Sequence, residues 1–423
     1  MPEGNLIPDD TARRHGVPDS LAVSRAIGKQ PIGRHAGLAR QQARLPISLS
    51  TVTDICMLVT SDLDRDPRVQ KEALSASKAG LSVTVVCRSA TIRPSDYHVV
   101  SLDAGRAETR LLKYAERLVI NVRLAKEAIR SHARLIHAND IDTMPAALSA
   151  ARVLGVPCLF DAHEYYCDAA RDMGWIGHKV AHWAEGIFAR RADRVITVSQ
   201  SLASAMASEL RIPTPLVVTN AARFEDCSKC APLPWRAELG DSKVVLFQGK
   251  YCIGRMLEET IDASCHFPPG VVLAMRGFGP LERELRARVD RTSAPVVFLD
   301  PVPMFGMVRA AVGADLGLFP CDIRLKTHLH SSPNKLFEYT MAGVPTIATD
   351  APDTRRVIEQ HSIGRLYDAE DAEDLARVVI DALSNPSSLR TLRENCLSAA
   401  RTLCWESESL GLLKVYKELL DRH

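Results

Sequence analysis

Short runs of apolar residues alternate with amphipathic stretches along most of the chain. The runs are rich in Val, Ile and Leu, which predicts buried strands, while the stretches between them have the period of a helix. In the first half of the chain the predicted strands are Ile55–Val59, Val83–Cys87, Leu135–His137, Pro157–Phe160, Val195–Val198 and Leu216–Val218. In the second half they are Val244–Phe247, Val271–Met275, Val296–Leu299, Leu316–Phe319 and Thr346–Ala348. Apolar strands separated by helices are typical of parallel sheets covered by helices on both faces.

The alternation occurs twice, which together with a length of 423 residues indicates two domains. Residues 220–242 hold clusters of cysteine and proline and few apolar runs, so we interpret this region as an interdomain linker. The predicted fold class is α/β, with two doubly wound, Rossmann-like parallel-sheet domains that bind ligands at the carboxyl ends of their strands. The predicted organisation is an extension over 1–53, a first domain over 54–222, a linker over 223–242, a second domain over 243–402 and a C-terminal helix over 403–423, which we expect to pack back on the first domain.

Residues 1–53 differ from the rest of the chain. They are polar, have scattered Gly and Pro, and contain more Arg and Lys than acidic residues. This composition predicts a disordered, mildly basic extension. A transit peptide is the alternative, but four acidic residues argue against it: Glu3, Asp9, Asp10 and Asp19.

Composition and charge limit the classes of partner. With 46% apolar and 25% charged residues, the chain has the composition of a folded globular protein. Its formal net charge is only +2, so we expect neither nucleic acid nor an acidic membrane as the main partner. No apolar run approaches the ~20 residues that span a bilayer, and no secretory h-region begins the chain. These features favour a cytoplasmic location.

Eleven cysteines in a chain of this length do not indicate a disulfide scaffold. Most lie within apolar runs and are interpreted as small buried hydrophobic residues. Cys227 and Cys230 form a single CxxC motif in the predicted linker. A zinc site would require a second pair at regular spacing, and none follows, so the sequence favours linker thiols over a metal site.

Residues 331–345 carry the most informative local pattern. Ser332 suits an N-cap and Pro333 the first helical position, so we predict a helix that begins at Pro333. The first-turn amides and the helix dipole form a natural phosphate site. Lys335 lies in that first turn, where a cation is unfavourable unless an anion binds, and Glu338 shares its face. The spacing alone fits two interpretations equally: a phosphate-binding Lys with a ribose-binding Glu, or a solvated ion pair.

This segment resembles the nucleotide-binding signature of the large retaining glycosyltransferase family 4, which has the two-domain GT-B architecture. Further motifs that resemble those of the family occur in the family's order: Asp66-Pro67-Arg68-Val69 with Lys71-Glu72, His137-Ala138-Asn139-Asp140, Asp161-Ala162-His163-Glu164, residues 192–199, Gln248-Gly249-Lys250 followed by Arg255, and Arg276-Gly277-Phe278-Gly279-Pro280. Each motif is modestly specific, but their order and spacing over about residues 54–423 are strong.

The resemblance implies a role for each matching residue. The residues implied to bind the donor are Gly249, Lys250, Arg255, His330, Ser331, Ser332, Asn334, Lys335 and Glu338, and those implied to act in catalysis are His163, Arg255 and Lys335. Lys250, Arg255 and Lys335 would hold the donor diphosphate. Glu338 would hold the ribose, and His163 would face the transferred sugar. The alternatives are exposed surface charges for Lys250 and Arg255, and a loop histidine bonded to backbone groups for His163.

Two positions depart from the family pattern. The family usually has a glutamate eight residues before the ribose-binding one, where it contacts the donor sugar, and this chain has His330 there. Met256 also occupies a position where glycine is common. The first departure leaves the sugar specificity open.

Asp62-Leu63-Asp64 resembles the metal-binding DxD motif of the other main glycosyltransferase fold. It follows the first strand of a doubly wound domain, which is the wrong context for that motif. An EF-hand loop is excluded because Pro67 occupies the position that needs glycine. We interpret these aspartates as residues that line the cleft or cap the next helix.

Residues 175–191 combine Trp183 with several basic residues, which fits a peripheral membrane face. Glu185 and the helical spacing fit a packed surface helix better. Peripheral membrane contact therefore stays a second interpretation of this segment.

The resemblance implies a retaining glycosyltransferase that moves a sugar from a GDP- or UDP-linked donor without a metal ion or other cofactor. Its predicted partners are the nucleotide sugar and an acceptor that is a glycan, a lipid-linked molecule or a small natural product. Two other functions share this architecture. One is a nucleotide-sugar epimerase, and the other is a non-catalytic sensor or scaffold, which the residue at position 330 brings into consideration.

Overall fold

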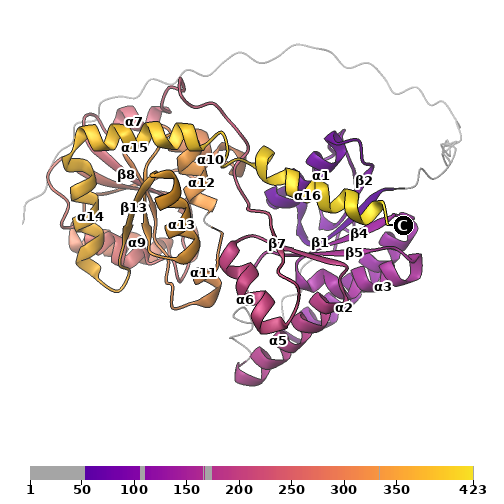
Figure 1. The fold of residues 1–423 in the computed structure, drawn as a ribbon. Helices are drawn as coiled ribbons and strands as arrows, with labels where there is room; N and C mark the ends of the chain where they lie inside the picture. Colours follow the sequence, from indigo (N-terminus) through magenta and orange to yellow (C-terminus); the bar gives the residue numbers. More distant parts are fainter. Residues whose placement is uncertain (1–52, 105–109, 165, 167–173, 333, 423) are drawn as a thin grey trace, which may run out of the picture. The chain divides into compact units, whose positions relative to one another are not determined.

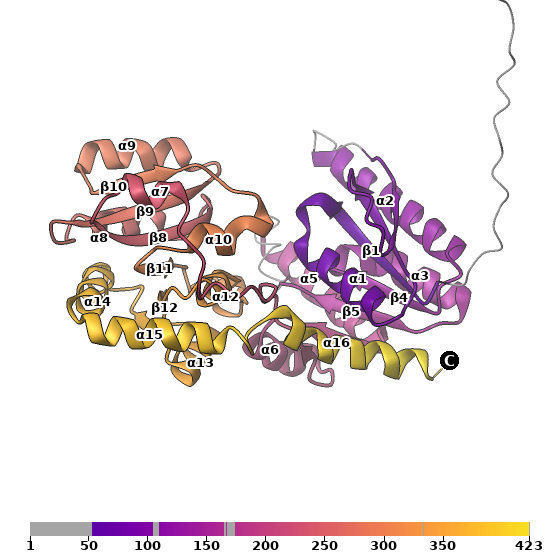
Figure 2. The same cartoon turned by 90° about the horizontal axis from the view of Figure 1, so that it is seen from above.

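The structure is a computed structural model of the chain. It describes residues 53–104, 110–164, 166, 174–332 and 334–422. All but the last residue of the predicted extension over 1–53 lies outside the described residues. In the described part, two parallel sheets are each flanked by helices on both faces (Figures 1 and 2).

The first sheet has seven parallel strands in the order β3-β2-β1-β4-β5-β6-β7. Their bounds are β1 Ile55–Asp62, β2 Val83–Ser89, β3 His98–Ser101, β4 Leu135–Asn139, β5 Cys158–Ala162, β6 Arg194–Thr197 and β7 Leu216–Val217. The strand order reverses direction between β1 and β4. In open α/β sheets, ligands bind outside the carboxyl ends of the strands at this switch point.

The second sheet has six parallel strands in the order β10-β9-β8-β11-β12-β13. Their bounds are β8 Lys243–Lys250, β9 Val271–Phe278, β10 Val296–Leu299, β11 Leu316–Phe319, β12 Thr346–Thr349 and β13 Gly364–Tyr367. Here the switch point lies between β8 and β11. The predicted α/β class with two doubly wound domains is confirmed.

Helices cover both faces of each sheet. In the first domain they are α1 Pro67–Lys78, α2 Arg110–Arg130, α3 Met144–Leu154, α5 Gly174–Arg191 and α6 Gln200–Leu210. In the remainder they are α7 Pro234–Glu238, α8 Leu257–Ser264, α9 Glu282–Thr292, α10 Met307–Ala311, α11 Lys326–Leu329, α12 Asn334–Met341, α13 Pro352–His361, α14 Ala372–Ser384, α15 Pro386–Ala399 and α16 Trp405–Leu420. Among the described residues, no helix is long and apolar enough to cross a membrane.

The last helix, α16, packs on the first sheet rather than the second, beside α1 (Figure 1). Successive residues of a strand point to opposite faces, so Ile55 and Met57 of β1 face α1 and α16, while Cys56 packs in the core under α2 and α3. The Trp405 Nε1 donates to Ser75 Oγ at 2.8 Å. The C-terminal segment is thus part of the first domain's core.

The two strands absent from the sequence prediction, β3 and β13, each lie at the edge of a sheet. Both are four residues long and mostly half-exposed, so neither carries the continuous apolar run that marks a buried strand. The predicted linker region contains one short helix, α7, which buries Trp235 against the second sheet.

Candidate active site

Strand β8 ends at the switch point of the second sheet in Gln248-Gly249-Lys250. Gly249 has a φ of +146°, and a Cβ at this position would lie 2.6 Å from Cε of Lys335. Only glycine fits here without displacing the lysine side chain. The sequence thus allows the Lys335 side chain to lie directly against the backbone of β8.

Helix α12 supplies Lys335 and Glu338. It begins at Asn334, one residue after Pro333, which lies outside the described residues. The Ser332 hydroxyl was predicted to cap this helix, but it has no hydrogen-bond partner among the described residues although it is buried. The capping interpretation is therefore wrong for the side chain.

Burial and a neighbouring cation disfavour the charged form of Lys335. Two cation–π contacts partly offset this, since its Nζ lies 5.6 Å from the ring centroids of both Phe247 and Phe319. Burial and the positive charge of Arg255 together lower the pKa of Lys335 to about 7, although Glu338 opposes the shift. A bound anion would reverse this balance by stabilising the charged amine.

Glu338 lies one helical turn from Lys335 and is held by Gln248. The Gln248 side-chain amide donates to Glu338 Oε2 at 3.3 Å and to the Met307 carbonyl at 3.0 Å. Burial raises the pKa of Glu338, while Lys335 opposes this shift. The carboxylate is therefore positioned but incompletely solvated, as expected for a group that accepts hydrogen bonds from a ligand.

Two cavities of about 400 Å³ each adjoin these residues. The first is lined by Arg68, His163, Arg255, His330, Ser331, Ser332 and Asn334, among others. The second is lined by Lys71, Glu225, Met307, Asn334 and Glu338, among others. Asn334 belongs to both. The structure thus brings together most of the predicted site residues, but Gly249, Lys335 and the exposed Lys250 line neither cavity.

His163 lies at the carboxyl end of β5, with both ring nitrogens near carboxylates. Its Nε2 is 2.8 Å from Asp161 Oδ2, and its Nδ1 is 3.4 Å from Asp140 Oδ1. Burial disfavours the charged imidazole, but Asp161 and Asp140 outweigh this effect and raise its pKa to about 10. His163 is consequently a cation at neutral pH and is not available as a general base.

The partner of His163, Asp161, is also bound by Arg68. The Arg68 guanidinium donates to both carboxylate oxygens at 2.9 and 3.0 Å and to the Val218 carbonyl at 2.9 Å. Glu72, Asp161 and His163 lie close enough to hold a metal ion. However, Arg68 already occupies both oxygens of Asp161, and its charge would repel a metal ion. We therefore interpret this cluster as a buried ion network.

Met256 and the aspartates that precede α1 also have clear positions. Met256 has a φ of +47° and precedes α8, which explains why a glycine is common there. Asp64 accepts hydrogen bonds from the amides of Thr91 and Ile92, and Asp66 caps α1 by accepting from Val69. These aspartates fix loops and a helix terminus, as predicted for the cap.

Two family models match the chain. The Glycosyltransferase Family 4 model matches residues 70–220, and the Glycosyl transferases group 1 model matches residues 251–385. The first range lies in the domain of the seven-stranded sheet and the second in that of the six-stranded sheet. The chain belongs to these glycosyltransferases.

This glycosyltransferase is 27% identical over 212 residues to the phosphatidyl-myo-inositol mannosyltransferase of Mycobacterium leprae. The alignment covers 47% of this chain and 52% of the relative, so the match spans about half of each protein.

Solved structures share the fold at lower identity. The sucrose-phosphate synthase of Thermosynechococcus elongatus is 16% identical, with a TM-score of 0.73 over 88% of this chain and 100% of that chain. Anabaena HepE in complex with UDP and glucose is 15% identical, with a TM-score of 0.66 over 87% of this chain and 100% of that chain. At these identities the likeness establishes the GT-B fold alone.

Sequence reasoning assigned no role to two polar residues of the glycosyltransferase that fix its backbone. Lys71 of α1 donates to the Asn220 side chain at 2.8 Å and to the Ala221 carbonyl at 2.5 Å, at the start of the linker. Asp353 of α13 accepts from the amides of Gln200 and Ser201 at 3.0 Å each, and so caps α6. Their partners lie about 150 residues away along the chain, so no local pattern indicates them.

Proposed function

We propose that the chain transfers a sugar from a GDP- or UDP-linked donor to an acceptor, with retention of anomeric configuration and without a metal ion. The observation that carries this proposal is the environment of Lys335. This amine is half-buried beside a second cation and lies one helical turn from a positioned carboxylate. Such an arrangement suits an anionic ligand that also carries hydroxyl groups. Anabaena HepE, a structural neighbour, was solved with UDP and glucose.

Each residue has a distinct task in this reaction. Arg255 and Lys335 neutralise the diphosphate, and Glu338 accepts hydrogen bonds from the ribose. As the bond to the diphosphate breaks, negative charge grows on the leaving group, and fixed cations then stabilise the transition state more than the ground state. His163 stays protonated and contributes its charge near the transferred sugar. The acceptor proton passes to the donor phosphate, because His163 cannot take it.

Release of nucleoside diphosphate tests the proposed activity. The full chain is incubated with GDP- and UDP-linked sugars, with and without glycan, lipid-linked and small-molecule acceptors. A transferase releases nucleoside diphosphate and forms a glycosylated acceptor. An epimerase changes the sugar without an acceptor, and a sensor binds the donor without turnover. Either of these two results would contradict the proposal.

Nucleotide binding is expected to be independent of magnesium, because fixed cations rather than a bridging metal neutralise the diphosphate. GDP or UDP should bind with equal affinity in magnesium-free buffer and in the same buffer with magnesium chloride. Isothermal titration calorimetry measures both affinities. A large gain in affinity on adding magnesium would show that the diphosphate needs a metal partner.

Nucleotide affinity should fall as the pH rises from 7 to 9. Lys335 has a pKa of about 7 in the free protein, and a bound diphosphate raises it. Above pH 7 binding therefore takes up a proton, and affinity falls by up to about tenfold per pH unit. Arginine stays charged throughout this range, so the Lys335→Arg variant should show a flat profile. The same slope in both proteins would mean that another group titrates.

A further inference from the structure

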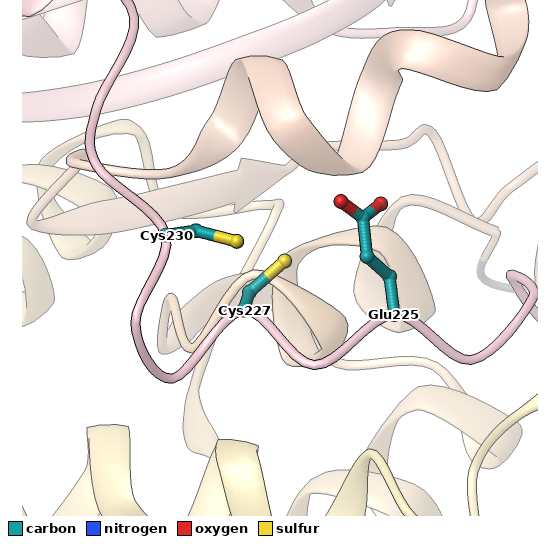
Figure 3. Close-up of side chains that lie close together, drawn as sticks. All are labelled: Glu225, Cys227 and Cys230. Atoms are coloured by element: carbon teal, nitrogen blue, oxygen red, sulfur yellow. The ribbon is translucent and has the colours of Figure 1, made fainter.

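Three potential metal ligands gather in the segment that connects the two domains. Figure 3 shows the side chains of Glu225, Cys227 and Cys230 on one stretch of chain, with the carboxylate and both sulfurs directed toward a common space. One carboxylate oxygen and the two Sγ atoms all lie within 4.8 Å of one another. The sequence alone disfavours a metal here because no second cysteine pair follows, and a single glutamate two residues upstream of a CxxC motif does not by itself indicate a third ligand.

We propose that Glu225, Cys227 and Cys230 bind one zinc ion, with a water molecule in the fourth position. Two thiolates and a carboxylate suit zinc, whereas magnesium and calcium prefer oxygen ligands alone. In a tetrahedral zinc site with Zn–S of about 2.3 Å and Zn–O of about 2.0 Å, ligand atoms are ~3.5–3.8 Å apart. The observed cluster needs to contract by only about 1 Å to reach this geometry.

The two cysteines are held in place by a turn and by the core. Cys227 is 6% exposed and packs with Trp235 and Val312 in the core of the second domain. The Cys230 amide donates to the Cys227 carbonyl at 3.1 Å, which closes the turn between them. Asp226 stabilises the same turn by accepting from the Ser228 amide at 3.0 Å. The backbone thus keeps both sulfurs on one side before any metal binds.

The third ligand, Glu225, is oriented by its neighbours. Its amide donates to the Met341 sulfur at 3.3 Å, which fixes the backbone against α12. Arg309 Nε lies 3.6 Å from one carboxylate oxygen. A partner of this kind positions a metal-binding carboxylate from outside the coordination sphere. Glu225 also lines the cavity that contains Glu338, so a zinc ion would fix the connecting segment beside the nucleotide site.

The buried cluster of Glu72, Asp161 and His163 provides a contrast. There the Arg68 guanidinium donates hydrogen bonds to both carboxylate oxygens of Asp161. At the linker cluster, Arg309 Nε lies 3.6 Å from a Glu225 carboxylate oxygen, which is longer than the Arg68–Asp161 hydrogen bonds. The alternative to zinc binding is a disulfide bond between Cys227 and Cys230, which would exclude the metal ion.

Metal binding to the full, reduced chain tests the proposal directly. Zinc is removed with a chelator, and zinc or cobalt is then titrated back. We expect one zinc per chain by elemental analysis, and thiolate-to-cobalt charge-transfer absorption together with the visible bands of tetrahedral cobalt. Cys227→Ser and Cys230→Ser should abolish both signals. Glu225→Gln should weaken zinc binding by roughly tenfold or more while keeping the cysteine turn.

Cys265→Ser is the matched control, because Cys265 is an exposed free cysteine at the end of α8 and not in the connecting segment. It should bind zinc like the unmodified chain. The proposal is overturned if the unmodified chain gives no thiolate–cobalt absorption, or if the chain isolated without reductant carries a Cys227–Cys230 disulfide. Unchanged zinc affinity in Glu225→Gln would also overturn the three-ligand site. None of these readouts depends on nucleotide binding, so they are independent of the proposed transferase activity.

Discussion

Replacing Lys335 with Ala is expected to lower turnover by about 10²–10³-fold at saturating donor, as loss of an oxyanion-stabilising donor does in other enzymes. Lys335 lies against Gly249 and near Arg255, where the proposed diphosphate binds. Its interaction with the leaving group strengthens as the glycosidic bond breaks. Steady-state kinetics on the variant measures kcat directly, and circular dichroism confirms that it is folded.

Glu338→Ala is the matched variant, because it lies one turn along the same helix but faces groups whose charge does not change during the reaction. It should weaken donor binding by about 1.5–3 kcal/mol and lower kcat less. Lys335→Ala should therefore mainly lower kcat, whereas Glu338→Ala should mainly weaken donor binding. A fully active Lys335→Ala variant would show that the lysine and glutamate are only a helix-surface pair.

Replacing Arg68 with Leu is expected to destabilise the first domain by about 3–5 kcal/mol, since it removes the guanidinium that pairs with the buried carboxylates of both Asp161 and Glu72. Asp161 is fully buried and would lose both of its guanidinium hydrogen bonds. Urea unfolding, monitored by circular dichroism, measures the decrease in the free energy of unfolding.

The control for this variant is Arg130→Leu, in the same domain. Arg130 pairs with Glu127 at 2.6 Å, but its side chain is 60% exposed. Such surface pairs contribute about 0–1 kcal/mol. If both variants show the same decrease in the free energy of unfolding, the buried network around Asp161 is not a major source of stability in this domain.

The fold was predictable because most strands are buried on both faces. Leu316–Phe319 is fully buried in the interior of its sheet and has the predicted bounds, since it is an apolar run that ends at a turn. Of the edge strands, β7 and β10 carry apolar residues and were predicted, whereas β3 and β13 include polar residues or glycine and were missed. The pattern of apolar residues therefore identifies a strand by its apolar run and misses short strands that lack one.

The candidate site was predictable only where it depends on local spacing. Lys335 and Glu338 are three residues apart, so their shared helix face follows from the helical period. The partner of Arg68 is 93 residues away, and that of Asp353 is 153 residues away. Such contacts depend on the packing of distant elements. The cation state of His163 depends on two carboxylates brought together in the same way.

A crystal structure of the chain with bound GDP or UDP tests the central claim most directly. A thermal-shift comparison of the two nucleotides selects the one that binds more tightly. We expect the diphosphate to contact Arg255 and Lys335 and the ribose hydroxyls to contact the Glu338 carboxylate. A nucleotide whose diphosphate lies away from both cations, or that binds only to the first domain, would contradict the assignment of the donor site.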